Sequence, residues 1–304
     1  MISFRYHLVT IVAVFLALGL GLLAGTTVIK PGLVQVLQKR TREAELRAQN
    51  AQQQVTDLQS QVSELIPFVV SGRLPATDVV IVTYEGSDGA MLSEAQSSLH
   101  AAGANVLAVL PVTSRVASTE VGTRQSLAKI VHAQSIATAP LQRDTAVAIA
   151  RRLTTRPGDL AAGTDLLGQL VSGGFIRKGD ISSATLRTIG APNQVVVALT
   201  GSSTKLPLPP QSFMVPLVEQ LVGKRPVAAG QTTNTADPFV PLLRSDTAVP
   251  AGEIVTIDDL EQPIGGAALV LGLDQLLASP ADGGGSYGVD GSSLIPTPAP
   301  IPTP

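Results

Sequence analysis

The sequence predicts a membrane-anchored α/β protein. We expect a single N-terminal transmembrane helix, a coiled-coil stalk, and a three-layer domain with a mostly parallel sheet of about five strands. Three observations predict this order. A long uncharged apolar run opens the 304-residue chain, apolar heptads follow it, and short β-branched runs alternate with helical patterns from residue 77 onward.

The apolar run covers residues 8–29, which contain no charged side chain, and "KPG" ends it. As a helix, its 22 residues would extend about 33 Å, enough for a hydrocarbon core of about 30 Å. A secretory signal has a shorter apolar region, of about 7–15 residues. We therefore expect a permanent single-pass anchor. The alternative is a signal peptide cleaved near Ala24 and Gly25, and a lipoprotein signal is excluded because the chain has no cysteine.

Heptads of apolar residues follow the anchor and predict a coiled coil over residues 33–66, about 50 Å long as a helix. The register extends over about five heptads, and Pro67 is expected to end the helix. Four large residues at a and d positions should form most of the seam: Val55, Leu58, Val62 and Leu65.

A parallel homodimer is the expected outcome of these heptads. Gly21 and Gly25 would extend the seam into the anchor, because G-x-x-x-G spacing lets two membrane helices approach closely. The alternative is a lone amphipathic stalk that lies against its own domain, since alanine and threonine fill the centre of the rod and bury little surface.

The α/β domain is expected over residues 77–279, where buried strands alternate with helices. The predicted strands are 78–84, 105–113, 194–201, 226–230 and 267–271. The predicted helices are 91–102, 124–132, 144–153, 160–170, 213–222 and 274–278. Residues 280–304 are rich in Gly and Ser and end in "PTPAPIPTP", so a disordered tail is expected there.

Composition excludes several classes of function. The net charge is −2, only 3% of the residues are aromatic and 14% are charged, so the chain offers neither a basic face nor stacking platforms for nucleic acid. Without cysteine there is no disulfide, no thiol chemistry and no Cys-ligated metal.

The residues expected at the carboxyl ends of the strands are small and polar, and ligands of open α/β sheets bind there. They include no His, Cys or Lys, so no nucleophile–base pair is visible, and neither an enzyme nor a cofactor is predicted. We interpret them mainly as turn and capping residues, with a small-molecule pocket as the alternative. They are Glu85, Ser87, Asp88, Thr113, Ser114, Thr200, Gly201, Ser202, Gln231, Thr232 and Thr233.

Two glycine motifs near the C-terminus lack the context that their chemistry needs, and one acidic segment precedes them. Gly284, Ser286 and Gly288 fit G-x-S-x-G, and residues 283–288 fit G-x-G-x-x-G, but no helix is expected after either motif. The "IDDLE" segment at 257–261 could hold a hard cation, but is more typical of a solvated turn or a helix N-terminus.

Soft-metal ligands are sparse. The domain has four candidates, Met91, Met214, His100 and His132, and no two of them lie at the spacing that would place them on one helix face. The sequence therefore predicts no metal site.

The opening "MISFRYHLVTIVAVFLALGLGLLAG", followed by a coiled coil and an α/β region, resembles the actinobacterial family of the mycobacterial copper transport protein B, MctB. "VVVALTG" at 195–201 and "SYG" at 286–288 also fit this resemblance. It implies a membrane-anchored cell-envelope protein in copper homeostasis or transport. Some proteins of this type resemble regulatory partners in cell separation, which control peptidoglycan hydrolases by binding. Histidines expected from the resemblance in the late glycine-rich segment are absent from 282–291.

The expected location is the cell membrane, with residues 1–7 in the cytoplasm and the α/β domain outside. The Lys/Arg count opposes this orientation, because Lys30, Lys39, Arg40 and Arg42 follow the apolar run and only Arg5 precedes it. Long downstream domains can translocate regardless of charge, and the resemblance also implies an external domain.

Two functions follow as hypotheses. One is a copper-homeostasis or transport protein that acts through oligomers or a loading partner. The other is a dimeric, non-enzymatic scaffold that binds an envelope protein and handles no metal itself. An envelope enzyme ranks third, because no catalytic group of residues was found.

Overall fold

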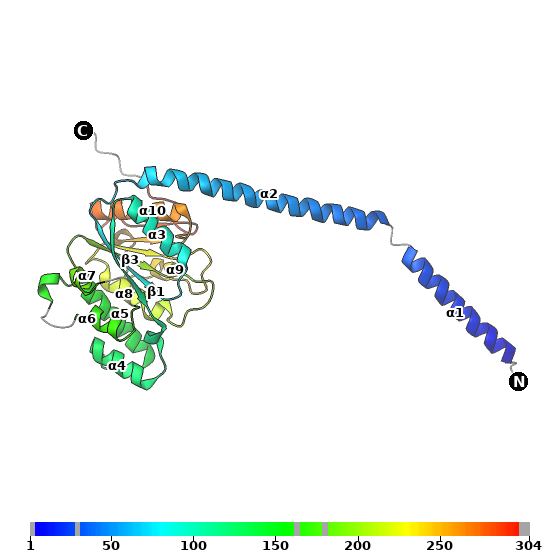
Figure 1. The fold of residues 1–304 in the computed structure, drawn as a ribbon, viewed down its shortest axis with the longest axis horizontal. Coiled ribbons are helices and arrows are strands. Elements are labelled where there is room, and N and C mark those ends of the chain that lie inside the picture. Colours follow the sequence, from blue (N-terminus) through cyan, green and yellow to red (C-terminus); the bar gives the residue numbers. More distant parts are fainter. Residues whose placement is uncertain (1–3, 28–30, 161–164, 178–181, 298–304) are drawn as a thin grey trace. The chain divides into compact units, whose positions relative to one another are not determined.

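The computed structural model describes residues 4–27, 31–160, 165–177 and 182–297. The chain divides into two compact units, Met1–Ser60 and Gln61–Pro304. The first unit contains helix α1 (Phe4–Thr27) and most of helix α2 (Pro31–Val70), and the second contains the end of α2 and the α/β domain (Figure 1). The predicted order of an apolar helix, a long helix and an α/β domain is confirmed.

Helix α1 is long and apolar enough to cross a membrane. Its window Tyr6–Ala24 has a mean hydropathy of 2.4, and no side chain in that window is buried against the rest of the protein. An exposed apolar surface on every side of a helix is what contact with lipid requires.

Helix α2 continues past Pro67 to Val70, so the prediction that this proline ends the helix is wrong. The proline removes one backbone hydrogen bond, but Ile66 and Val70 on either side are buried in the core of the domain. Their burial holds the last turn in place.

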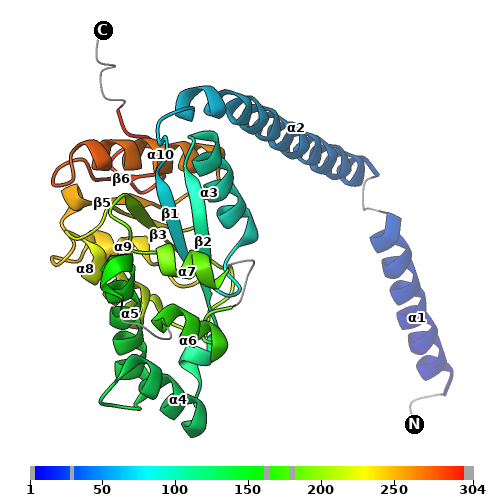
Figure 2. The ribbon, with the colours of Figure 1, turned by 60° about the vertical axis from the view of Figure 1, so that its left-hand side comes forward.

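Six parallel strands form one sheet in the order β2-β1-β3-β4-β5-β6 (Figure 2). The strands predicted near 78–84, 105–113, 194–201 and 226–230 are confirmed, because each contains a β-branched or apolar run that the sheet buries. The strands are β1 (Asp78–Tyr84), β2 (Asn105–Val112), β3 (Gln194–Leu199), β4 (Val227–Gly230), β5 (Ile254–Ile257) and β6 (Gly285–Tyr287).

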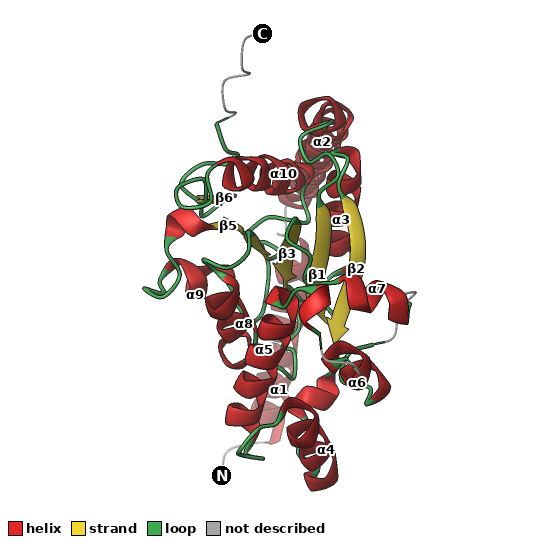
Figure 3. Cartoon of the chain, turned by 90° about the vertical axis from the view of Figure 1, so that its left-hand side faces the viewer, coloured by secondary structure: helices red, strands yellow, loops and turns green. Residues whose placement is uncertain are grey.

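Helices cover both faces of this sheet and give the three predicted layers (Figure 3). One core lies under α3 (Gly89–Ala101), α10 (Pro263–Ala278) and the end of α2. The opposite core lies mainly under α5 (Thr138–Thr154) and α8 (Met214–Leu221). The remaining described helices are α4 (Val121–Val131), α6 (Leu166–Ser172), α7 (Ser183–Thr188) and α9 (Val240–Arg244).

The strand predicted at 267–271 does not exist, because these residues form the centre of helix α10. The helix is buried over almost its whole length, and a short apolar run of this kind cannot be distinguished from a buried strand by periodicity. Gly272 allows the close packing: an added Cβ would lie 2.7 Å from Val255 of β5.

The expectation of a disordered tail from residue 280 is wrong for the described part, 280–297. Residues 285–287 form β6, which pairs with β5. Neither β5 nor β6 was among the predicted strands, and together with the four confirmed strands they make the sheet six-stranded. Tyr287 is 6% exposed and belongs to the core beneath α3 and α10. Residues 298–304 lie outside the described part.

Candidate functional site

The carboxyl edge of the sheet contains a topological switch point, the usual ligand position in open α/β folds. Strand β2 lies on one side of β1 and β3 on the other, so the chain changes direction between the ends of β1 and β3. Tyr84 is the last residue of β1, and Thr200 follows β3 directly. Of the predicted edge residues, Thr200 and Ser202 lie at this point.

A small pocket lies at this switch point. It is a narrow crevice with no space wide enough for a water molecule. The loop over the pocket is held by backbone donors: Leu206 N–H donates to Asp237 Oδ2 at 3.2 Å and Ser202 N–H donates to Thr235 Oγ1 at 3.3 Å. The polar residues of the lining are Tyr84, Thr200, Ser202, Thr204, Thr235 and Asp237. A ligand would have to displace this loop to enter.

Hydroxyl groups without hydrogen-bond partners cluster at the end of β1. The side-chain oxygens of Thr83, Tyr84 and Ser87 are all buried and unpartnered. Burial raises the pKa of the Tyr84 phenol well above its usual value; the backbone of Met214 opposes this and the Asp237 charge reinforces it. The phenol is therefore neutral at physiological pH, so it can form hydrogen bonds but cannot act as a base.

Most of the other predicted edge residues have structural roles. Asp88 Oδ1 accepts from Ala90 N–H at 2.7 Å and caps α3, and Thr113 Oγ1 donates to Gly174 O at 2.7 Å. Gln231 Oε1 accepts from the N–H groups of Phe239 and Val240 at 2.7 and 2.8 Å. These contacts agree with the interpretation of turn and capping residues.

The acidic pair in "IDDLE" is buried, contrary to the expectation of a solvated turn. Asp258 and Asp259 follow β5 and are 3% and 2% exposed. Arg244 of α9 forms an ion pair with Asp258 at 2.6 Å. Among the residues described, no three acidic or histidine side chains are arranged to hold a metal ion, so the hard-cation hypothesis gains no support here.

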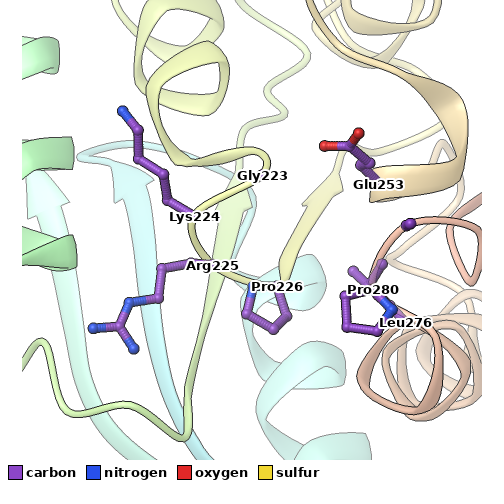
Figure 4. A pocket seen from close by; sticks show the side chains of 8 residues that line it. Gly223, Lys224, Arg225, Pro226, Glu253, Leu276 and Pro280 are labelled. Carbon is purple, nitrogen blue, oxygen red and sulfur yellow. The ribbon is translucent and has the colours of Figure 1, made fainter.

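A second pocket, of about 470 Å³, lies at the opposite edge of the sheet, where β4 and β5 begin (Figure 4). Figure 4 shows that the charged groups of Lys224 and Arg225 point away from Pro226 and Pro280. Arg225 is also engaged, since its guanidinium donates to backbone carbonyls including Pro192 O at 2.9 Å. The lining is therefore mainly apolar, with Glu253 and the two cations at its margin, and Arg225 already engaged.

The four candidate soft-metal ligands do not come together. Met91 and Met214 are fully buried, but in the two cores on opposite faces of the sheet. His100 is exposed on α3, and His132 is exposed at the C-terminal cap of α4 in a left-handed conformation. A shallow depression of about 730 Å³ beside His132 also contains Lys129 but no Met. These four side chains therefore do not converge on one point.

The late glycine motifs have packing roles. A Cβ at Gly284 would lie 2.4 Å from Ile254 O, and one at Gly283 would lie 2.2 Å from Gln275 O. The segment leads into β6 and then a turn, so neither motif has the following helix that its chemistry needs. The glycines allow the C-terminal segment to approach β5 and α10.

The predicted seam residues lie on α2 with their side chains in solvent. Val55 is 47% exposed, Leu58 60%, Val62 39% and Leu65 62%. Val62 and Leu65 belong to the same unit as the domain, and their exposure shows that they do not pack on it. The alternative of a stalk lying against its own domain predicts buried side chains at these two positions. Gly21 and Gly25 lie within α1, where an added Cβ at Gly21 would meet no atom within 4 Å.

Comparison with known families gives one match, and it covers almost the whole chain. The model of the family described as "Copper transport outer membrane protein, MctB" matches residues 1–298. The comparison with curated proteins gives no match. A family match that runs from the apolar helix through the sheet to β6 confirms the resemblance indicated by the opening block. The chain therefore belongs to the MctB family of copper transport outer membrane proteins.

Proposed function

We propose that this protein is a non-enzymatic, membrane-anchored envelope protein that contributes to copper homeostasis by presenting its α/β domain to a protein partner. Copper is the cargo of that system and is not ligated by this chain. The family match supports the link to copper transport, and the apolar helix supports the anchor.

The observation that carries the partner role is the separation of the soft ligands. A selective Cu(I) site needs two or more converging sulfur or imidazole donors. Met91 and Met214 are enclosed in different cores, and the exposed His100 and His132 lie on different helices. The described residues also contain only one helix that could span a membrane, and a single helix cannot enclose a pore. Transport would therefore depend on other chains.

A dimeric scaffold in cell separation is the second candidate. The solvent-exposed a and d residues on α2 favour it, because exposed large apolar side chains in heptads are suited to pairing with a second helix. In this alternative the domain binds a regulator of peptidoglycan hydrolases, and copper has no role.

A Cu(I) titration of the full chain in detergent, against a competing chelator, tests the proposal. We expect only weak binding, unchanged by His100→Ala or His132→Ala. A stoichiometric site of nanomolar affinity that either substitution abolishes would contradict it.

Copper sensitivity and cell separation of a deletion strain, measured together, distinguish the two candidates. The copper proposal predicts sensitivity that both His variants complement. A strain with normal copper tolerance but unseparated cells would favour the scaffold.

A further inference from the structure

The buried acidic pair after β5 lies beside the C-terminal segment that forms β6. Asp258 and Asp259 follow the last residue of β5, and residues 285–287 pair with that same strand. The charge state of this acidic pair can therefore affect how strongly the edge strand β6 is attached to β5.

Arg244 connects the acidic pair to this segment. Its Nη1 donates to Asp258 Oδ2 at 2.6 Å and to Asp290 O at 3.1 Å, and its Nη2 donates to Tyr287 O at 2.9 Å. Asp258 Oδ2 also accepts from Asp290 N–H at 3.1 Å. One arginine and one carboxylate oxygen thus fasten β6 and the turn after it.

The other oxygen of Asp258 and one oxygen of Asp259 remain unsatisfied. Both Oδ1 atoms are buried and have no hydrogen-bond partner. They face the same point: a Cβ built on Gly288 would lie 2.1 Å from Asp258 Oδ1 and 2.9 Å from Asp259 Oδ1. These two distances place the oxygens no more than 5.0 Å apart, so two ionised carboxylates would repel each other there, and protonation of one would remove that repulsion.

The surroundings of Asp259 supply more negative than positive charge. Burial raises its pKa most, and the charges of Asp258 and Glu261 add to this, whereas the backbone of Asp259 and the Arg244 charge oppose it; together they bring the pKa to about 6. No titratable group lies in the first turn of α10, which packs on the other side of Asp259 through Gly265.

Two further elements approach the same place. From α3, Glu94 lies against Gly266, where an added Cβ would be 2.5 Å from its Oε1. The C-terminal turn contributes Tyr287, a neutral phenol whose pKa burial raises, and the exposed Asp290. None of these groups supplies a cation that could replace a proton at Asp259.

We propose that Asp258 and Asp259 share one proton, and that this proton strengthens the attachment of the edge strand β6 at mildly acidic pH. Protonated Asp259 donates a hydrogen bond to Asp258 Oδ1, which leaves Asp258 Oδ2 free to keep Arg244 and the Asp290 amide. Loss of the proton places two facing negative charges under Gly288 and loosens the segment.

The direction of the pH dependence follows from the thermodynamic linkage between protonation of Asp259 and attachment of the segment. The carboxyl of Asp259 has a higher pKa with the segment attached than when exposed, so attachment favours the protonated form. The added stability is complete below the ordinary carboxyl pKa of about 3.9 and is lost as the pH rises through about 6. Opening of the segment should be about tenfold less frequent at about pH 5 than at about pH 7.5.

Hydrogen exchange of the full chain in detergent, followed by mass spectrometry, measures this opening. The reporters are the amides of Gly288, Asp290 and Ser292, each of which donates a hydrogen bond within the clamp or the turn. After correction for intrinsic exchange rates, wild-type protection should rise about tenfold between about pH 7.5 and about pH 5. Asp259→Asn, which carries a permanent donor, should show high protection at both values.

A matched variant and an added cation make the test decisive. Asp282→Asn removes an exposed carboxylate just before the same segment and should keep the wild-type pH dependence. Equal protection of wild type and Asp259→Asn at both pH values would overturn the proposal. Protection at about pH 7.5 that millimolar Ca²⁺ or Mg²⁺ restores, in wild type but not in Asp259→Asn, would also overturn it and indicate a metal site instead.

Discussion

At the scale of single residues, buried polar groups give the sharpest predictions about stability. The Tyr84 hydroxyl lies at the switch point of the sheet; only the Met214 backbone acts on its oxygen, and its proton has no acceptor of good geometry, which is rare for a buried group. An unsatisfied buried donor lowers the free energy of unfolding.

Replacing Tyr84 with Phe should raise the free energy of unfolding by about 1 kcal/mol, because it removes an unsatisfied buried donor while keeping the ring in place. Urea denaturation of the full chain in detergent measures this change. Tyr287→Phe, at a hydroxyl not among the buried unpartnered atoms, is the control and should stay within about 0.5 kcal/mol of wild type. A less stable Tyr84→Phe variant would show that the hydroxyl does form a hydrogen bond.

Arg152 gives a second residue-level prediction. It is 5% exposed, forms an ion pair with Asp165, and donates to Ile189 O at 2.7 Å and Leu186 O at 2.8 Å. Arg152→Ala should lower the free energy of unfolding by about 3–5 kcal/mol, because Asp165 would remain buried without its partner.

The neighbouring Arg151 provides the matched control for this substitution. It lies on the same helix but is exposed, so Arg151→Ala should change the free energy of unfolding by no more than about 0.5 kcal/mol. Equal effects of the two substitutions in the same urea titration would show that the buried ion pair contributes little.

At the scale of elements, the first four strands could be predicted because each reads as a continuous buried run. Helix α10 was mistaken for a strand because burial on nearly all sides removes the helical periodicity. Strand β6 was missed because "GSY" is too short and too polar for a sequence pattern, and long-range contacts with Arg244 hold it.

The candidate site was predictable only in its position. The carboxyl ends of β1 and β3 follow from strand order, so Thr200 and Ser202 were expected at the edge. The contributions of Tyr84 and Asp237 were missed, because Asp237 comes from a loop far along the chain. Likewise, no sequence pattern links Arg244 to Asp258, since a single Arg–Asp pair has no spacing signature.

Helix α2 gives the prediction for pairing. We expect its exposed a and d residues to form a parallel dimer, and Leu58→Asp with Val62→Asp would place unpaired charges in the seam. Analytical ultracentrifugation of the full chain in detergent should then show monomer in place of dimer.

The control adds the same charges outside the seam. Gln53→Asp with Ser60→Asp changes two f positions of consecutive heptads, on the face of α2 opposite the seam, and this variant should remain dimeric. A wild-type chain that is monomeric at high concentration would contradict the dimer and leave α2 as a single stalk.

On the scale of the whole molecule, α1 is the feature that fixes where the protein can act. A helix with a mean hydropathy of 2.4 and a fully exposed surface is suited to lipid, and the MctB family match extends through it. The charges near its ends favour the opposite orientation to the one proposed, since Lys39, Arg40 and Arg42 all follow it. Domain size is the opposing factor, because long segments translocate largely regardless of charge.

Protease added to intact protoplasts should therefore digest the chain beyond residue 33 and leave the anchor protected. The structure offers suitable sites for cleavage by trypsin, since Lys39, Arg40 and Arg42 are exposed on α2. Peptides should be identified by mass spectrometry, with a cytoplasmic protein followed as the control for lysis. If residues beyond 33 survive in intact protoplasts but not after lysis, the domain is cytoplasmic, the Lys/Arg count governs the orientation, and an envelope partner for the α/β domain is excluded.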